Sequence, residues 1–301
     1  MTGEHQPTCG DITVNGYSVK TKMGKVRHML GYCPQFDAIV PLMTGRENLF
    51  FFARIKGIGP DKIENVVNTL VRKMDLSDHE NRLAGTYSGG NKRKLSVAIA
   101  LVGNPPIVML DEPSTGMDPH AKRFMWSVIA DTMADRCLVL TSHSMEECEA
   151  LCNTIGIMAD GQLKCIGSPQ HLKGRFGEGY QLQVKFTESA DVKRAVQDFV
   201  FSTFPSATNE PKEETPSRLC FSIKRDVSLA DIFRRVLENK DRLSLTDYSV
   251  SQSTLEQVFM RFADHATPGQ PAQGVALNDT PTLESNPSSS TLSKKKSISV
   301  V

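Results

Sequence analysis

The stretch IVMLDEPSTGMD, residues 107–118, decides the fold. It begins with a short apolar run, typical of a buried parallel strand, and two acids, Asp111 and Glu112, follow at once. Ligands of open parallel sheets bind at the carboxyl ends of the strands. The stretch therefore predicts a buried strand that carries two acids to a ligand-binding edge.

The flanking segments extend this strand into an α/β fold. CLVL (137–140) is a second apolar run, and Asp118-Pro119 forms an N-cap and first-turn pair for a helix between the two runs. Capping boxes at Thr44–Glu47 and Ser144–Glu147 predict two further helix starts. Strands alternating with helices predict a parallel sheet with helices packed on it over about the first 170 residues.

The two acids require different roles, because adjacent residues of a strand point to opposite sides. An acid at a strand end can orient Mg²⁺, usually through water, and a second acid can polarise a water for attack on phosphorus. We assign metal orientation to Asp111 and the general-base role to Glu112. Solvated acids are the alternative, but His143 follows the next strand on the same edge and can reach a γ-phosphate.

The segment YSGGNKRKLS, residues 87–96, is a second candidate phosphate site. Ser88 can cap a helix, and Gly89 and Gly90 let backbone N–H groups approach a ligand closely. A helix N-terminus suits an anion. The basic run Lys92–Lys94 raises the local potential, although a solvated helix face is the favoured reading of Lys92 and Lys94.

These motifs, in this order, resemble the ATP-binding cassette (ABC) ATPases. YSGGN is similar to the signature, IVMLDE to the Walker B strand, STGMD to the D-loop and TSHS to the switch-histidine loop. CPQFDAI places Gln35 at the Q-loop position, with a helical subdomain between it and the signature. Three segments resemble the A subfamily of lipid exporters: YSGGNKRKLS, residues 31–57 and residues 247–263. The last of them resembles the regulatory domain that follows the C-terminal cassette of these exporters.

The resemblance implies ATP and Mg²⁺ as cofactors and a second nucleotide-binding domain as partner. The signature residues would contact the partner's ATP, and the transmembrane domains would be reached through the Q-loop and the helical subdomain. For catalysis the resemblance implies Glu112, His143 and Gln35. Mg²⁺ would be held, largely through water, by Asp111 and Gln35. ATP bound by the partner domain would be contacted by Ser88, Gly89, Gly90 and Asn91 and by the D-loop residue Asp118.

No P-loop of the form GxxxxGK[ST] occurs in the sequence. Gly24-Lys25 is the nearest match, but Val26 follows where Ser or Thr is needed. By the resemblance the P-loop would lie upstream of Met1, so we expect a fragment with an incomplete sheet. We expect the isolated chain not to hydrolyse ATP, to be marginally stable, and to be soluble or aggregation-prone.

Composition and resemblance together divide the chain into three expected parts. Residues 1–176 form an ABC-type nucleotide-binding domain without Walker A, and residues 177–264 form a small ferredoxin-like α+β regulatory domain. Residues 265–301 are poor in large apolar groups and are expected to be a disordered tail. Its last residues, Ser299–Val301, are a weak candidate for a PDZ-type groove.

The implied function is the ATP-hydrolysing part, on the cytosolic face of a membrane, of an A-subfamily transporter of sterol or phospholipid. The lipid would be met only through membrane domains outside this sequence. The alternative is a non-catalytic interaction module that supplies its signature to a partner cassette. A net charge of +1 over 301 residues argues against nucleic-acid binding, and the 7 scattered cysteines suggest reduced, cytosolic thiols.

Overall fold

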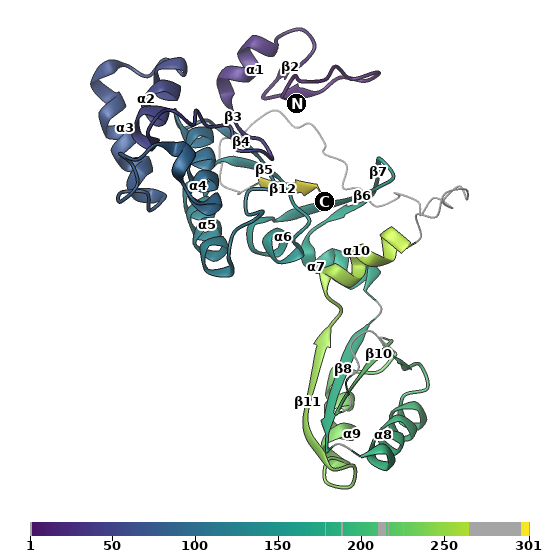
Figure 1. Ribbon diagram of the computed structural model, residues 1–301. Helices are drawn as coiled ribbons and strands as arrows, with labels where there is room; N and C mark the ends of the chain where they lie inside the picture. The colour runs from purple at the N-terminus through teal and green to yellow at the C-terminus, as the bar shows by residue number, and fades with distance from the viewer. Residues whose placement is uncertain are drawn as a thin grey trace. The chain divides into compact units, whose positions relative to one another are not determined.

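The computed structural model describes residues 2–177, 179–187, 189–209, 215, 217–224, 226–264 and 296–300 (Figure 1). These residues form two compact units that divide between Ile166 and Gly167, with residues 296–300 joining the first unit. Helix α7 (Pro169–Phe176) falls in the second unit, whereas the sequence placed it in the first. The domain boundaries of the sequence analysis stay a prediction.

The first unit is built on a parallel sheet. Its strands lie in the order β3-β4-β5-β12-β6-β7, and β3, β4, β5 pair in parallel. The α/β fold class is confirmed. The strands are β3 (Leu30–Cys33), β4 (Ile107–Asp111), β5 (Cys137–Thr141), β6 (Thr154–Ala159), β7 (Gln162–Gly167) and β12 (Lys296–Val300).

The two faces of the central strand β4 differ in how deeply their side chains are buried. On β4, Val108 and Leu110 are fully buried, while the residues between them are half-buried. Ile107 and Met109 instead pack against a small cluster that includes Val26. This cluster comes from β1 (Thr13–Val14), β2 (Tyr17–Ser18), α1 (Met23–Met29) and the residues beside them.

Helix α4 (Gly89–Leu101) packs closely on β3 and β4. A Cβ atom added at Gly31 would lie 2.0 Å from the carbonyl oxygen of Ala100. Only glycine therefore permits this approach of strand and helix. The close packing joins the C-terminal end of α4 to the start of β3.

A helical pair, α2 (Gly45–Ile55) and α3 (Pro60–Lys73), lies between β3 and α4 in the sequence (Figure 1). The predicted capping box at Thr44 and Glu47 is confirmed in both of its hydrogen bonds. The remaining helices of this unit are η1 (Ala84–Thr86), α5 (Pro119–Thr132) and α6 (Met145–Leu151).

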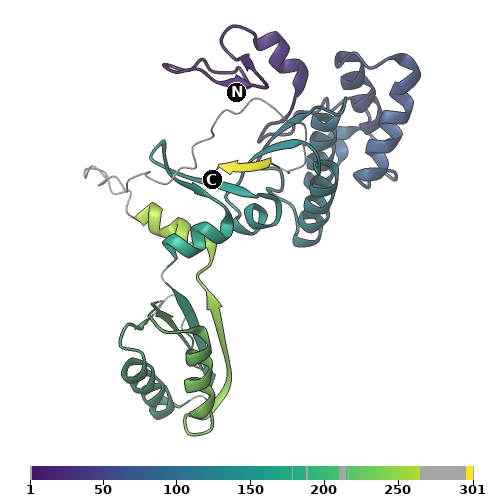
Figure 2. The same cartoon turned by 180° about the vertical axis from the view of Figure 1, so that it is seen from behind.

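Strand β12 corrects the prediction of a disordered tail for residues 296–300. It lies between β5 and β6 and is parallel to both, with Lys296 opposite Cys137 and Ile298 opposite Thr154 (Figure 2). The composition of this segment predicts disorder because few large apolar groups offset its chain entropy, but pairing on both edges satisfies its backbone. Residues 265–295 and 301 lie outside the described residues.

The second unit has the predicted ferredoxin-like arrangement. Its sheet is antiparallel, in the order β11-β8-β10-β9. The two-residue strand β9 was not predicted, because it falls in a segment read as a polar loop. The elements are β8 (Tyr180–Phe186), α8 (Ala190–Thr203), β9 (Thr208–Asn209), β10 (Arg218–Ile223), α9 (Leu229–Glu238), β11 (Leu245–Gln252) and α10 (Leu255–Asp264).

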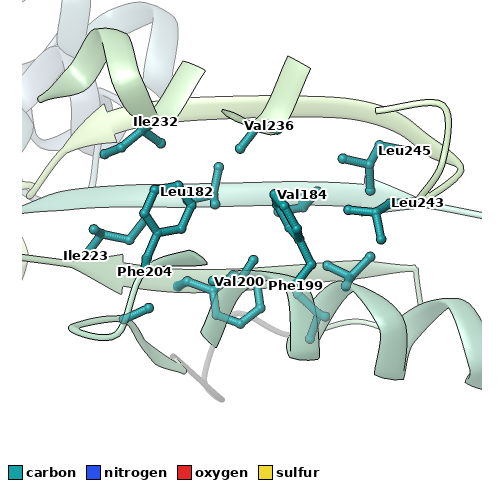
Figure 3. Packing of buried hydrophobic residues seen from close by; sticks show 14 of the residues in the cluster. Leu182, Val184, Phe199, Val200, Phe204, Ile223, Ile232, Val236, Leu243 and Leu245 are labelled. Carbon is teal, nitrogen blue, oxygen red and sulfur yellow. The ribbon is translucent and has the colours of Figure 1, made fainter. Parts of the chain in front are cut away.

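The core of the second unit joins both long helices to the sheet. Figure 3 shows Val200 of α8 and Ile232 of α9 packing with Leu182 and Val184 of β8. Elsewhere in this unit, Phe262 of α10 contacts the ring of Phe176 in α7. No helix in the described part of the chain is both long enough and apolar enough to span a bilayer.

Candidate functional site

The predicted site residues follow the carboxyl ends of three adjacent parallel strands. Gln35 comes two residues after β3, Asp111 ends β4 and Glu112 comes directly after it, and His143 follows β5. The register places Asp111 opposite Thr141. The topology therefore brings all four predicted residues to one edge of the sheet.

Glu112 and His143 are in direct contact. His143 Nδ1 lies 2.7 Å from Glu112 Oε2, and the hydroxyl of Thr115 donates to the same oxygen at 3.0 Å. The side chain of Glu112 is 18% exposed and that of His143 is 73% exposed. The carboxylate is thus held from two sides, and the imidazole faces solvent, where a ligand could reach it.

Asp111 is oriented by the neighbouring strand. The hydroxyl of Thr141 donates a short hydrogen bond to Asp111 Oδ1. The backbone N–H of Glu112 also donates to the carbonyl of Thr141, at 3.0 Å. Thr141 of β5 therefore contacts both acids, through the carboxylate of Asp111 and the backbone of Glu112, while the Glu112 carboxylate contacts His143 and Thr115.

The buried acid Glu147 holds the residues on either side of His143 in place through hydrogen bonds. Glu147 is fully buried, and its carboxylate accepts from the Ser142 hydroxyl and from Trp126 Nε1 at 2.9 Å. The Ser142 hydroxyl oxygen accepts from the N–H of Ser144. Glu147 was predicted as half of a capping box, but only the Ser144 half forms, because the carboxylate is engaged by Ser142 and Trp126.

The signature residues form the N-terminal end of α4. Ser88 is its N-cap and accepts from the N–H of Asn91 at 3.3 Å, as predicted for a capping serine. A Cβ atom at Gly89 would meet no atom within 4 Å, so the backbone is open to close approach there, and Gly90 lies near Met117. The Ser88 hydroxyl bonds within the helix cap, not with Glu112 or His143.

Asp118 serves as the N-cap of α5. Its carboxylate accepts from the N–H groups of His120 and Ala121, both at 3.0 Å. The hydrogen bond from Ala121, followed by that from His120, lowers the pKa of Asp118. The described interactions of Asp118 are those of a helix cap.

The donor set around Asp111 suits a metal ion bound largely through water. No group of three or more His, Cys, Asp or Glu that could hold a metal occurs among the described residues. Asp111 and the exposed Gln35 offer a carboxylate and an amide, and Mg²⁺ accepts such a small protein share because it keeps several waters. This small donor set suits Mg²⁺ that is bound together with a nucleotide better than it suits an ion held by protein ligands alone.

Sequence reasoning missed two cationic residues of the basic run. Arg93 is 3% exposed and Lys94 is 9% exposed. Lys94 was read as part of a solvated face, but its Nζ lies 4.7 Å from the ring centroid of Phe124 and 3.5 Å from Asp75. The signal available in the sequence was the long apolar run that follows these two residues in α4. It indicates a helix buried on all sides, in which Arg93 and Lys94 would also be buried.

Family models match both units. Residues 1–115 match the ABC transporter model, and residues 177–252 match the model of the ABCA1-like, C-terminal R1 regulatory domain. Among solved structures, an ATP-binding subunit of an ABC transporter covers 58% of this chain and 73% of its own, with a TM-score of 0.53 and 24% identity. This likeness shows the cassette fold.

Curated relatives are similar over most of the chain. Human retinal-specific phospholipid-transporting ATPase ABCA4 is 47% identical over 89% of this chain, and rat phospholipid-transporting ATPase ABCA3 is 48% identical over 87%. Human ATP-binding cassette sub-family A member 2 is 46% identical over 87%. The chain spans only 12%, 16% and 11% of the length of these relatives.

Proposed function

Because the chain belongs to the A subfamily of the ABC transporters, we propose that it is the ATP-hydrolysing part of a transporter that moves phospholipid or sterol across a membrane. The observation that carries the proposal is the contact of Glu112 with His143 at the ends of adjacent parallel strands. Phospholipid as a substrate is supported by the names of the relatives ABCA4 and ABCA3.

Each acid has a separate role in this proposal. Glu112 accepts a proton from the water that attacks the γ-phosphate, and His143, in contact with Glu112, contacts the phosphate from the next strand. Asp111 and Gln35 would hold Mg²⁺ largely through water, and the ion would supply charge neutralisation at the phosphate oxygens when bound with ATP. The hydroxyls of Thr141 and Thr115 keep the two carboxylates oriented.

The signature acts on a different nucleotide. Ser88, Gly89, Gly90 and Asn91 present the open N-terminal end of a 13-residue helix, which suits the phosphates of ATP held by a second nucleotide-binding domain. Asp118 approaches the same partner as part of the D-loop. A solved structure titled as the dimeric, post-hydrolysis state of an ATP-binding cassette supports such a pairing.

A pocket beside the helical pair supports the proposed coupling to transmembrane domains. It has a volume of about 710 Å³, and its lining includes two exposed apolar side chains, Leu42, which is 85% exposed, and Phe51, which is 40% exposed. A lining that mixes exposed apolar and charged side chains suits an amphipathic segment of a partner. The lining residues are Leu42, Met43, Thr44, Arg46, Glu47, Phe50, Phe51, Arg54 and Asn81.

The catalytic assignment is tested in a transporter that carries this cassette. Glu112→Gln should abolish steady-state ATP hydrolysis at this site and leave ATP binding intact, since the amide cannot accept the proton. Glu146→Gln is the matched control, an exposed acid on α6 whose loss should not change the rate. Undiminished turnover in Glu112→Gln would remove Glu112 from the general-base role.

The chain by itself is proposed to bind MgATP weakly and not to hydrolyse it, because no GxxxxGK[ST] loop occurs in its sequence. Titration calorimetry on the purified chain should give no saturable heat at micromolar MgATP. A micromolar affinity would show that other residues hold the phosphates.

A further inference from the structure

Arg93 is a buried cation whose guanidinium faces backbone carbonyls. It is 3% exposed, and its ion-pair partner, Asp37, lies at the 4.0 Å limit. Nη1 donates to the carbonyls of Pro34 and Gln35 at 2.7 and 3.1 Å. A guanidinium has five N–H donors in a planar fork, and a buried one must satisfy them within the protein.

The other donors converge on the end of β4. Nε donates to the carbonyl of Pro113 at 3.1 Å, and Nη2 donates to that of Glu112 at 2.9 Å. Nη2 also donates a short hydrogen bond to the carbonyl of Asp111. Three consecutive carbonyls therefore point at one side chain, which an extended strand cannot arrange, because its carbonyls alternate in direction.

The backbone of Glu112 explains this convergence. Its φ is +51°, in the left-handed region that non-glycine residues seldom occupy. Such a conformation is unfavourable and persists only where the surroundings enforce it. The same turn is closed by the N–H of Thr115, which donates to the Glu112 carbonyl at 3.3 Å.

We propose that Arg93 is a positioning residue that holds Glu112 in the left-handed conformation. By doing so it aims the Glu112 carboxylate at His143, and through Nη1 it fixes the segment that carries Gln35. One side chain of the signature helix thereby sets the geometry of the site that contains Glu112, His143 and Gln35 in the same chain. The catalytic meaning of this geometry rests on the proposed function, whereas the conformational claim does not.

The conformational claim is tested by comparing glycine with alanine at position 112. Both substitutions remove the carboxylate, but only alanine is strained at positive φ. With Arg93 present, Glu112→Gly should be more stable than Glu112→Ala, with an unfolding equilibrium constant about fivefold smaller. The measurement is urea unfolding of the full chain, followed by fluorescence of Trp126, its one tryptophan.

The same comparison is then made with Arg93→Met. Without the guanidinium, residue 112 can leave the left-handed region, so the advantage of glycine over alanine should disappear. Arg93→Lys, which keeps the charge but not the fork, should reduce the advantage in the same direction, and it serves where Arg93→Met does not fold. An unchanged glycine advantage in the Arg93 variants would overturn the proposal.

Glu146 provides the matched control position. It is an exposed glutamate within α6, where alanine should be more stable than glycine by the ordinary helix preference. This preference should be the same with and without Arg93. If Arg93→Met changed both positions equally, the effect would be a general loosening of the unit and the proposal would be wrong. None of these outcomes depends on ATP hydrolysis.

Discussion

Asn48 offers a quantitative test of how the loop after the Q-loop position is held. It lies in α2 and is fully buried. Its Oδ1 accepts from the N–H of Val40 at 2.8 Å, and its Nδ2 donates to the carbonyls of Val40 at 3.0 Å and Thr44 at 2.9 Å. One amide thus fastens residues 40–44 to the helical pair.

The cost of Asn48→Leu follows from which groups lose their partners. The Val40 carbonyl still accepts from the N–H of Met43, and the Thr44 carbonyl still accepts from the backbone N–H of residue 48. The Val40 N–H, which is only part-buried, loses its described partner, a loss toward the lower end of about 1–3 kcal/mol. The Nδ2 bonds to the carbonyls of Val40, Met43 and Thr44 are also lost, although the Met43 carbonyl still accepts from the N–H of Ala84. With an offset from burying an apolar side chain, we expect about 2 kcal/mol in total.

The assay is urea unfolding monitored at Trp126, which lies in the same unit as Asn48. For a slope of about 2 kcal/mol per molar urea, the midpoint should fall by about 1 M. Asn65→Leu is the matched control, because Asn65 is an exposed asparagine on the neighbouring helix α3. A midpoint that stays at the wild-type value in Asn48→Leu, or that falls equally in both variants, would refute the reasoning.

Three further predictions concern the cap, a thiol and the interior strand. Asp118→Ala should lower the melting temperature at neutral pH. Because the folded pKa of Asp118 lies below 3.8, this difference should persist above that value and shrink as pH falls through the folded pKa, which thermal melts across this range would check. Burial raises the pKa of Cys165 to about 11, so iodoacetamide at mildly alkaline pH should modify the exposed Cys9 before it modifies Cys165. Peptide mass spectrometry would measure the labelling of each thiol, and equal labelling would contradict the burial of Cys165. Ile298→Pro removes a backbone donor from a strand paired on both sides and should lower the urea midpoint reported by Trp126, whereas an unchanged midpoint would argue that β12 contributes nothing.

Local rules of the sequence predicted what local contacts determine. The capping box at Thr44 needs only residues three apart, and the cap at Ser88 needs only its own helix. The edge that collects Glu112 and His143 follows from the parallel order of two short apolar runs. In the second unit, alternating strands and helices were enough to give the ferredoxin-like arrangement.

The parts that were missed depend on partners distant in the sequence. Arg93 appeared as one cation of a basic run, but its acceptors lie 18 to 20 residues away at β4 and 58 to 59 residues away at Pro34 and Gln35. Glu147 matched a capping pattern, yet Trp126, 21 residues earlier, engages it. Spacing rules carry no information about such contacts.

Strand β12 also affects the order in which the first unit can fold. Its pairing with β5 joins residues about 160 positions apart, and closing so long a loop costs entropy and slows folding. The second unit lies entirely within that loop. When this unit folds first, it removes most of the freedom of the intervening chain, so the late pairing of β12 becomes a shorter closure. Refolding of the first unit should therefore slow when the second unit is destabilised.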